Sequence, residues 1–421
     1  MFLFYQILVF FIILFLPIIL LFRIFTKKED KIRFIEKLSI FSKKRSYGNL
    51  VWFHGSSVGE ILSVVPLIKN LEKNKSIKQI LITSSTLGSS IVFKKFKFKK
   101  TVHQFFPIDA FFLTNKFLNY WKPTIAIFIE SEIWPCMFAD IKKRLIPLIL
   151  INARITKKTF DKWFSFKNFA YSIFNKINFA YPQNLETLKY LKKLKVDNIK
   201  LIGNLKYSEN KNDNTKVLDQ KILNELKFRK IWCASSTHLG EELICAESHI
   251  KLKKKFKNLL TIIIPRHVQR SNEIKKKLEE LNLKVLLRSS NKKKLNKIDI
   301  YLVDTYGETN KFYKTTNTVF LGGSFIKHGG QNPIEAARLG ADIIHGPHVN
   351  NFKEVYKLLN SKKISHQAKN VNQLTNIIEK SIKDLSNNKA KFLKIKNFGK
   401  SILKITTNEI NNLIKNEIKK T

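Results

Sequence analysis

Apolar residues occur along this chain in short, nearly continuous runs that alternate with longer amphipathic segments, many of them rich in lysine. Short apolar runs of this kind are typical of strands buried on both faces of a parallel sheet. The amphipathic segments between them predict helices, so the pattern indicates repeated βαβ units. The predicted strands are 50–53, 80–83, 124–129 and 147–151 in the first half, and 231–234, 259–264, 300–303, 318–321 and 342–345 in the second. We therefore expect an α/β protein with two doubly wound sheets.

The N-terminal segment differs from the rest because residues 2–22 carry no charge and are dense in Leu, Ile and Phe. About 20 apolar residues span a bilayer as one helix. Arg23 and Lys27 follow, and positive flanking residues favour the cytoplasmic side. The pattern predicts a membrane anchor over residues 1–26. A cleavable signal peptide is the alternative, but it normally begins with basic residues, and none precedes this run.

The length of 421 residues suits two domains with additional segments. Residues 208–216 are strongly polar and form the best candidate for a linker. The predicted organisation is an anchor, a first Rossmann-like domain, a linker, a second Rossmann-like domain and a basic amphipathic helical tail. The corresponding ranges are 1–26, 27–207, 208–228, 229–388 and 389–421.

Charge is the most unusual feature of the composition, since 77 Lys and Arg against 32 Asp and Glu give a net charge of +45. Two explanations stay open. Abundant Lys, Asn, Ile and Phe are expected where composition drifts toward AT-rich codons, which places charge on solvated faces. The charge also favours an anionic membrane surface, at about 1 kcal/mol per basic residue near it. A nucleic-acid partner is not expected, because no recognised binding module accompanies the charge.

Several classes of site are disfavoured by the residues themselves. The three cysteines, at positions 136, 233 and 245, are widely spaced, so neither a disulfide framework nor a zinc ribbon is indicated. The histidines lack the spacing of metal ligands, and neither a P-loop nor a G-x-S-x-G motif occurs. We expect no metal and no cofactor.

Polar motifs follow the predicted strands of the first half directly, where open α/β sheets bind ligands. Glu60 ends the turn His54-Gly-Ser-Ser-Val-Gly-Glu60. This turn fits a capped helix start, and it equally fits a carboxylate that accepts a proton from an attacking hydroxyl. Glu130 begins a second acidic turn, for which helix capping is the alternative. Arg154 and Lys206 follow later strands and are suited to neutralising negative charge, although a solvated lysine is the simpler interpretation.

The second half carries several strand-end loops suited to an anionic ligand. His238 precedes a plausible helix start, and the N–H groups at such a terminus bind phosphate. Arg266 and His267 follow the next strand, and arginine donates two parallel hydrogen bonds to phosphate. Two glycine-rich segments, 322–324 and 329–335, complete the set, and Glu335 is placed to bind ribose hydroxyls. Together the loops indicate a nucleotide-type ligand.

These motifs jointly resemble those of the Kdo transferases, which attach 3-deoxy-D-manno-octulosonic acid (Kdo) to the lipid A precursor of Gram-negative bacteria. The nine motifs that carry the resemblance, in order, are His54-Gly-Ser-Ser-Val-Gly-Glu60, Glu130-Ser-Glu-Ile-Trp-Pro135, Asn152-Ala-Arg154, Gly203-Asn-Leu-Lys206, Ser236-Thr-His238, Pro265-Arg-His267, Gly322-Gly-Ser324, Gly330-Gln-Asn-Pro-Ile-Glu335 and Gly346-Pro-His348. The chain departs from the family pattern at Gly55, Cys136 and Leu239, none of which is a proposed catalytic residue.

The resemblance implies a GT-B fold, with two Rossmann-like domains facing a cleft. It implies inverting transfer of Kdo from the donor CMP-Kdo to the acceptor lipid IVA at the inner membrane. Glu60 then corresponds to the catalytic base, and Glu130 and Lys206 to positions that stabilise the transition state. The implied CMP contacts are Arg266, His267, Gly307, Glu308, Thr309, Asn332, Pro333, Ile334 and Glu335. Two alternatives stay open, a GT-B enzyme that uses a UDP-sugar and a membrane-tethered nucleic-acid binder.

Overall fold

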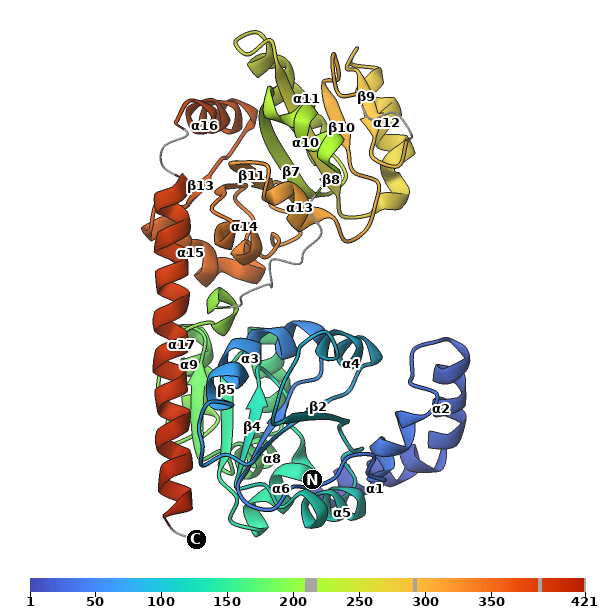
Figure 1. The fold of residues 1–421 in the computed structure, drawn as a ribbon, viewed down its shortest axis with the longest axis vertical. Coiled ribbons are helices and arrows are strands. Elements are labelled where there is room, and N and C mark those ends of the chain that lie inside the picture. Colours follow the sequence, from blue (N-terminus) through green and yellow to red (C-terminus); the bar gives the residue numbers. More distant parts are fainter. Residues whose placement is uncertain (209–217, 291–293, 385–387, 420–421) are drawn as a thin grey trace. The chain divides into compact units, whose positions relative to one another are not determined.

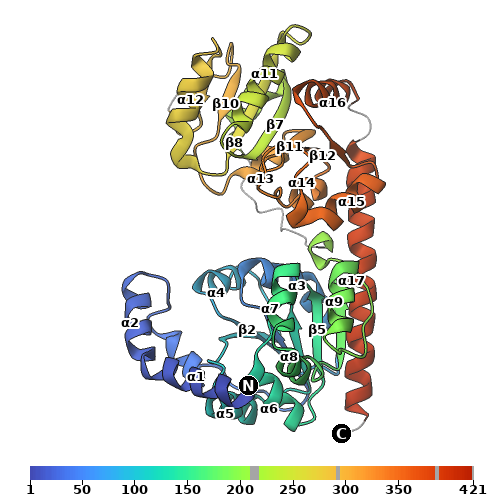
Figure 2. The same ribbon diagram turned by 180° about the vertical axis from the view of Figure 1, so that it is seen from behind.

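The computed structural model describes residues 1–208, 218–290, 294–384 and 388–419. The chain divides into two compact units, which are described separately below. Unit 1 comprises Met1–Asn210 and Gly399–Thr421, and unit 2 comprises Lys211–Phe398. Each unit is built around one parallel β-sheet with helices packed against it (Figures 1 and 2). Most of the predicted linker, residues 209–217, lies outside the described residues.

Unit 1 contains a six-stranded sheet in the order β3-β2-β1-β4-β5-β6, and every pairing in it is parallel. Its strands are β1 (Leu50–His54), β2 (Gln79–Ser84), β3 (Thr101–Phe105), β4 (Ile125–Ile129), β5 (Leu148–Ala153) and β6 (Phe179–Pro182). The four strands predicted in this half correspond to β1, β2, β4 and β5, and are confirmed. The two strands that the pattern missed, β3 and β6, are the two edges of the sheet.

The helices of unit 1 cover a core that the strands build from alternate residues. Trp52, Phe128 and Leu150 point from three strands into one cluster with Phe117 of α5 and Phe138 of α6. Burial of large aromatic side chains at this density is a main source of stability for such a sheet. The helices are α3 (Val58–Leu71), α4 (Leu87–Phe93), α5 (Phe111–Trp121), α6 (Pro135–Lys143), α7 (Lys157–Phe164), α8 (Lys167–Phe174) and α9 (Leu185–Lys193), with η1 (Arg33–Leu38) and η2 (Leu205–Ser208).

The apolar N-terminus forms two helices, α1 (Phe2–Leu14) and α2 (Leu16–Phe25), bent by 55° at Phe15. The prediction of one continuous spanning helix is therefore wrong. Pro17, which lacks a backbone N–H, stands in the first turn of α2 and cannot extend the hydrogen bonding of α1. Within the described residues no single helix is long and apolar enough to cross a membrane, and only this bent pair meets those criteria jointly.

One face of α1 is packed onto unit 1. The Tyr5 hydroxyl donates to Asp109 at 2.8 Å, and Val9 packs against Ala110 and Leu113. Tyr5 and Val9 are four residues apart and therefore share one face of the helix. The remaining faces of α1 and α2 expose large apolar side chains, which include Phe4, Phe11 and Phe22.

Unit 2 contains a seven-stranded parallel sheet in the order β13-β12-β11-β7-β8-β10-β9. Its strands are β7 (Lys230–Thr237), β8 (Leu259–Pro265), β9 (Val285–Leu287), β10 (Ile300–Leu302), β11 (Thr318–Leu321), β12 (Asp342–His345) and β13 (Ser365–Gln367). The five strands predicted here are confirmed as β7, β8, β10, β11 and β12. The two that the pattern missed, β9 and β13, are again the sheet edges.

The helices of unit 2 include one within the range assigned to the linker. Residues 220–227 form α10, whose Ile222 and Leu226 are buried. The other helices are α11 (Glu241–Lys253), α12 (Ser271–Glu279), α13 (Thr309–Tyr313), α14 (Ile334–Arg338), α15 (Lys353–Ser361) and α16 (Val371–Lys383), with η3 (Val268–Arg270) and η4 (Asn350–Phe352).

The predicted C-terminal helix is present as α17 (Asn388–Ile418). Its residues from Gly399 onward belong to unit 1, where Ile402, Ile410 and Ile414 are buried. The side-chain amide of Asn74, in the loop after α3, also donates to Asn411 at 2.9 Å. This part of the helix therefore packs on the first domain.

Gly399 marks a close approach between α17 and η2. A Cβ atom at Gly399 would lie 2.2 Å from the carbonyl oxygen of Tyr207, which is backbone and cannot rotate away. Replacing glycine by alanine inside a helix normally stabilises it by about 1 kcal/mol. Here the contact reverses that sign, because the helix must move to relieve the clash.

We predict that Gly399→Ala lowers the free energy of unfolding of the protein by about 1–3 kcal/mol. Urea unfolding followed by circular dichroism measures this change. The matched control is Lys400→Ala, at the exposed next position of the same helix. A stability gain in Gly399→Ala would contradict the packing of α17 described above.

Candidate active site

Three strand ends of unit 1 bring the predicted catalytic residues to one edge of the sheet. β1, β4 and β5 are neighbours; Glu60 lies in the first turn of α3 after β1, Glu130 directly follows β4, and Asn152 is near the end of β5. Lys206 reaches the same edge from η2. The structure therefore brings together Glu130 and Lys206, two residues far apart in the sequence.

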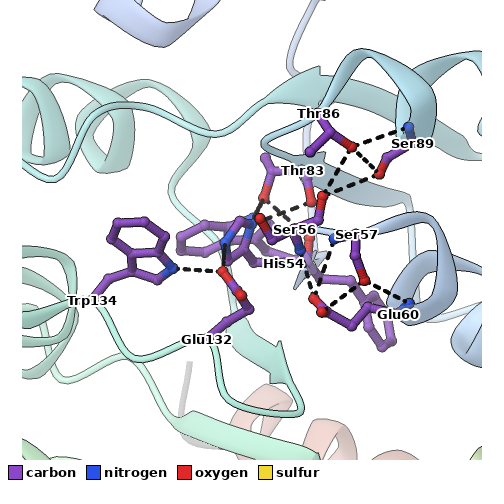
Figure 3. Close-up of polar contacts among 11 residues, drawn as sticks. His54, Ser56, Ser57, Glu60, Thr83, Thr86, Ser89, Glu132 and Trp134 are labelled. Atoms are coloured by element: carbon purple, nitrogen blue, oxygen red, sulfur yellow. Dashed lines mark hydrogen bonds and ion pairs between the residues drawn. The ribbon is translucent and has the colours of Figure 1, made fainter. Parts of the chain in front are cut away.

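Glu60 is the third residue of α3 and closes a capping box. Its carboxylate accepts hydrogen bonds from the backbone N–H of Ser56 at 2.7 Å and from the Ser57 hydroxyl at 2.8 Å, while the Ser57 hydroxyl caps the Glu60 N–H (Figure 3). Burial raises the pKa of Glu60 to about 7, with the charges of Glu132 and Glu130 adding to the rise against these hydrogen bonds. A pKa near neutrality suits a general base.

The turn that holds Glu60 is braced by the loop after β2. The Thr86 and Ser89 hydroxyls donate to the Ser56 carbonyl at 3.3 and 3.1 Å (Figure 3). Thr86 also caps α4 by accepting from the Ser89 N–H. These hydroxyls therefore support the backbone that positions Glu60.

Glu130 and Lys206 form an ion pair of 2.6 Å, and both side chains are largely buried. Asn152 donates to the same carboxylate at 3.3 Å and accepts from the Leu205 N–H at 3.0 Å. Glu130 and Asn152 have φ angles of 57° and 50°, in the left-handed region that side chains rarely adopt. Backbone strain at two touching residues is typical of functional sites.

Glu132 lies in the loop after β4 and is held by two aromatic N–H donors. His54 Nε2 is 3.2 Å and Trp134 Nε1 is 3.0 Å from the same carboxylate oxygen (Figure 3). His54 is fully buried, and its Nδ1 lies 3.0 Å from the Thr83 hydroxyl. Burial lowers the pKa of His54, so the imidazole is neutral at physiological pH.

In unit 2, Arg266 and His267 follow β8 and meet a group of histidines. The His238 ring lies 5.9 Å from that of His267 and 4.2 Å from that of His328, measured between centroids. Gln331 contacts His238 at 3.3 Å. Burial lowers the pKa of His238, and the neighbouring cationic groups add to this effect. An anion bound beside His238 would favour its protonated form, because an opposite charge stabilises the imidazolium.

The glycine-rich loop after β11 binds a carboxylate of the chain itself. Glu241, which is fully buried, accepts from the backbone N–H groups of His238, Gly323, Ser324 and Phe325 at 2.7–3.0 Å. These four backbone donors are therefore occupied by a side chain of the protein itself. The loop remains tightly packed, since a Cβ at Gly322 would lie 2.5 Å from a carbonyl oxygen.

The remaining predicted nucleotide-contact residues lie in two further loops of unit 2. Glu308 binds Lys311 at 2.7 Å and Arg288 at 3.1 Å, and although burial opposes it, these bonds and one from Thr305 bring the pKa of Glu308 down to about 2. Gly307 and Thr309 flank it. Asn332 accepts from the Ile334 N–H at 3.1 Å, which starts α14. Pro333 is the N-cap and Glu335 is exposed in the first turn.

Three residues without a predicted role belong to these clusters, namely His54, Glu132 and His328. His54 and Glu132 stand within the quoted motifs, but nothing local distinguished them from capping or packing residues. Position at a strand end was the available signal, and it applied to His54. Among the described residues no group of His, Cys, Asp or Glu is arranged to hold a metal ion.

The two parallel sheets define an α/β protein of the GT-B-like class. The structure is similar to a UDP-GlcNAc 2-epimerase from Neisseria meningitidis, with a TM-score of 0.58 and 15% identity over 86% of this chain and 100% of that one. It is also similar to a glycosyltransferase from Rickettsia africae, with a TM-score of 0.55 and 14% identity over 89% of this chain and 100% of that one. At such identities the likeness establishes the fold.

Sequence comparison identifies the family within that class. Residues 31–209 match the family model described as 3-deoxy-D-manno-octulosonic-acid transferase (kdotransferase). The chain is also 33% identical to the 3-deoxy-D-manno-octulosonic acid transferase of Rickettsia prowazekii, over 87% of this chain and 78% of that protein. The chain belongs to the 3-deoxy-D-manno-octulosonic acid transferase family.

The raised pKa of Glu60 predicts a stability effect that depends on pH. The pKa of Glu60 is about 7 in the folded protein, against an ordinary value of 4.5. The stabilisation that comes from its protonated form is therefore complete below pH 4.5. This contribution is lost as the pH rises through 7. Glu60→Gln keeps the capping box without the charge, since glutamine also serves at this position. We therefore expect the variant to gain stability over wild type, by about 1–2 kcal/mol, between pH 4 and about pH 8.

Thermal unfolding of the two proteins across this pH range measures the difference. Glu186→Gln removes the same charge from an exposed position in unit 1 and serves as the control. A constant difference between Glu60→Gln and wild type at every pH would show that Glu60 titrates normally.

Proposed function

We propose that this chain is an inverting glycosyltransferase that moves Kdo from CMP-Kdo to lipid IVA in the synthesis of the lipopolysaccharide core. The observation that carries the proposal is the Glu60 carboxylate, placed at a strand end with a pKa near neutrality in a member of the Kdo transferase family. Family membership supports the donor sugar. The residues of the two units support the steps below.

Glu60 acts as the general base. The acceptor hydroxyl oxygen forms a bond to the anomeric carbon of Kdo as the bond from that carbon to the phosphate oxygen of CMP breaks. The electron pair of the broken bond leaves with CMP, and the hydroxyl proton goes to Glu60. Hydrogen bonds from Ser56 and Ser57 fix the carboxylate during the transfer. Such base assistance contributes about 10²–10⁴-fold to the rate.

The Glu130–Lys206 pair stabilises the transition state. The Kdo carboxylate and the departing phosphate both bring negative charge, which a fixed ammonium offsets. Glu130 orients Lys206 through their 2.6 Å contact, and Asn152 orients Glu130. The strained backbone at Glu130 indicates that this orientation is maintained against a conformational cost.

Unit 2 binds the nucleotide of the donor. Arg266, His267 and the neighbouring His238 supply positive charge and hydrogen bonds to the CMP phosphate. Glu335 and Asn332, at the start of α14, bind hydroxyl groups of the ribose, with Pro333 and Ile334 shaping that turn. The Gly307-Glu308-Thr309 loop contacts the cytosine side. Because Glu308 is already bound by Arg288 and Lys311, its role is to hold that loop.

Glu60→Gln tests the assignment of the base. We expect its transfer rate with CMP-Kdo and detergent-dispersed lipid IVA to fall by about 10²–10⁴-fold while the protein stays folded. Mass spectrometry of the lipid product measures the rate, and Glu186→Gln is the matched control. Transfer by Glu60→Gln at the wild-type rate would refute the role of Glu60. If the wild-type protein transferred sugar from a UDP-sugar and not from CMP-Kdo, the assignment of CMP-Kdo as the donor would be refuted.

The α1–α2 pair is proposed to anchor the protein at the inner membrane, with both units on the cytoplasmic side. Large apolar residues on its free faces, among them Phe4, Phe11 and Phe22, are between 57% and 66% exposed. Water-exposed apolar surface of this kind is favourably buried in a bilayer. Arg23, in the last turn of α2, and Lys27, just after that helix, suit anionic headgroups. Anchoring brings the enzyme to an acceptor whose acyl chains remain in the membrane.

A triple variant, Phe4→Glu, Phe11→Glu and Phe22→Glu, tests the anchor without deleting the packed face of α1. We expect its co-flotation with vesicles containing anionic lipid to fall by at least about tenfold, since each buried Phe contributes about 1.5–3 kcal/mol. Leu145→Glu, at an 85% exposed position elsewhere in unit 1, is the control. Equal flotation of the triple variant and wild type would exclude an anchoring role for this pair.

A further inference from the structure

Glu132 is held in place more firmly than a loop carboxylate normally is. One of its oxygens accepts from both His54 Nε2 and Trp134 Nε1, at 3.2 and 3.0 Å. His54 cannot move, because it is fully buried and its ring stacks on Phe106 with centroids 3.7 Å apart. Two ring donors on one oxygen therefore fix the position of the Glu132 carboxylate.

The Glu132 carboxylate can only accept a hydrogen bond, so the contact with it places the His54 proton on Nε2. The Trp52 indole donates to the Thr83 hydroxyl at 2.9 Å, and that hydroxyl lies 3.0 Å from His54 Nδ1. The neutral imidazole then carries its proton on Nε2 and donates it to Glu132.

Glu132 and Glu130 differ in how their charges are compensated. Glu130 has a cationic partner, the ammonium of Lys206 at 2.6 Å. In the part of the chain that the structure describes, the ion-pair contact found for Glu132 is with His54, which is neutral. Glu132 therefore keeps a net negative charge at the site, whereas the charge of Glu130 is largely offset.

We propose that Glu132, fixed by His54 and Trp134, is a positioning residue whose uncompensated negative charge strengthens Glu60 as a base. The two carboxylates come from adjacent strands, since Glu132 follows β4 and Glu60 follows β1 (Figure 3). In this proposal Glu60 takes the proton, and Glu132 does not contact the reacting atoms. Glu132 acts on Glu60 through charge across a partly buried site, where screening by water is weak.

The pKa of Glu60 agrees with this geometry. Burial is the largest cause of its rise, the charge of Glu132 is the next, and Glu130 contributes less. Glu132, whose charge has no cationic partner among the described residues, thus raises the pKa of Glu60 more than Glu130, whose charge is offset by Lys206. A stronger base takes a proton from a hydroxyl more readily, and it remains ionised at working pH only if its pKa stays near 7. The charge of Glu132 helps to bring the pKa of Glu60 near 7, where the carboxylate is both a strong base and still partly ionised. The proposal rests on the assignment of Glu60 as the base.

The first measurement needs neither donor nor acceptor. A water-soluble carbodiimide with an amine nucleophile modifies carboxyl groups in their protonated form, and mass spectrometry of the peptide that contains Glu60 gives the pH at half-maximal labelling. We expect Glu132→Gln, which removes the charge and keeps the shape, to shift this midpoint down by about one pH unit. Glu132→Asp, which keeps the charge, should bring it back toward the wild-type value.

The second measurement is the pH profile of kcat/KM for Kdo transfer. In Glu132→Gln we expect the acid limb to move to lower pH together with the labelling midpoint, and the plateau to fall because the base is weaker. Glu186→Gln, an exposed residue of the same unit, should change neither quantity. A purely structural role for Glu132 would lower the plateau and leave both midpoints in place.

The outcomes separate the two proposals. An unchanged labelling midpoint in a folded Glu132→Gln protein would refute the action of Glu132 on Glu60, whatever the enzyme transfers. A shifted labelling midpoint with no wild-type transfer from CMP-Kdo would refute the proposed function and retain the coupling of the carboxylates. A shifted labelling midpoint with an unmoved kinetic limb would show that Glu60 is not the base.

Discussion

The capping box at the start of α3 is the interaction on which the candidate site depends. It satisfies backbone donors that the helix would otherwise leave open, and it fixes the carboxylate of Glu60 with the N–H of Ser56 and the hydroxyl of Ser57. The same hydrogen bonds favour the ionised form, while burial and nearby carboxylates favour the protonated form. The structural and the catalytic interpretations of Glu60 are therefore compatible, because one arrangement serves both.

Internal carboxylates organise both units in a similar manner. In unit 2, Glu241 gathers four backbone N–H groups and so shapes the glycine-rich loop from within. In unit 1, Glu130 and Glu132 order Lys206, His54 and Trp134 around the edge of the sheet. A chain with so large an excess of basic residues thus uses several of its few acids to build strand-end loops.

The interior of both sheets was predictable from the sequence, whereas their edges were not. Interior strands are covered on both faces and read as continuous apolar runs, such as β4 and β8. The four strands that were missed are all edge strands, for example β3, with its half-exposed Thr101 and Val102, and the three-residue β13. Edge strands are shorter or less buried, so their composition resembles that of loops.

The sequence by itself determined the fold class, the family and the residues at the strand ends, because these follow from local periodicity and from the order of short motifs. Tertiary structure alone decided how those residues interact. It placed the Glu241 carboxylate against the backbone of the glycine-rich loop after β11. It also joined Glu130 to Lys206 and Glu132 to His54. Such pairings depend on distances between segments far apart in the chain, and local patterns carry no information about those distances.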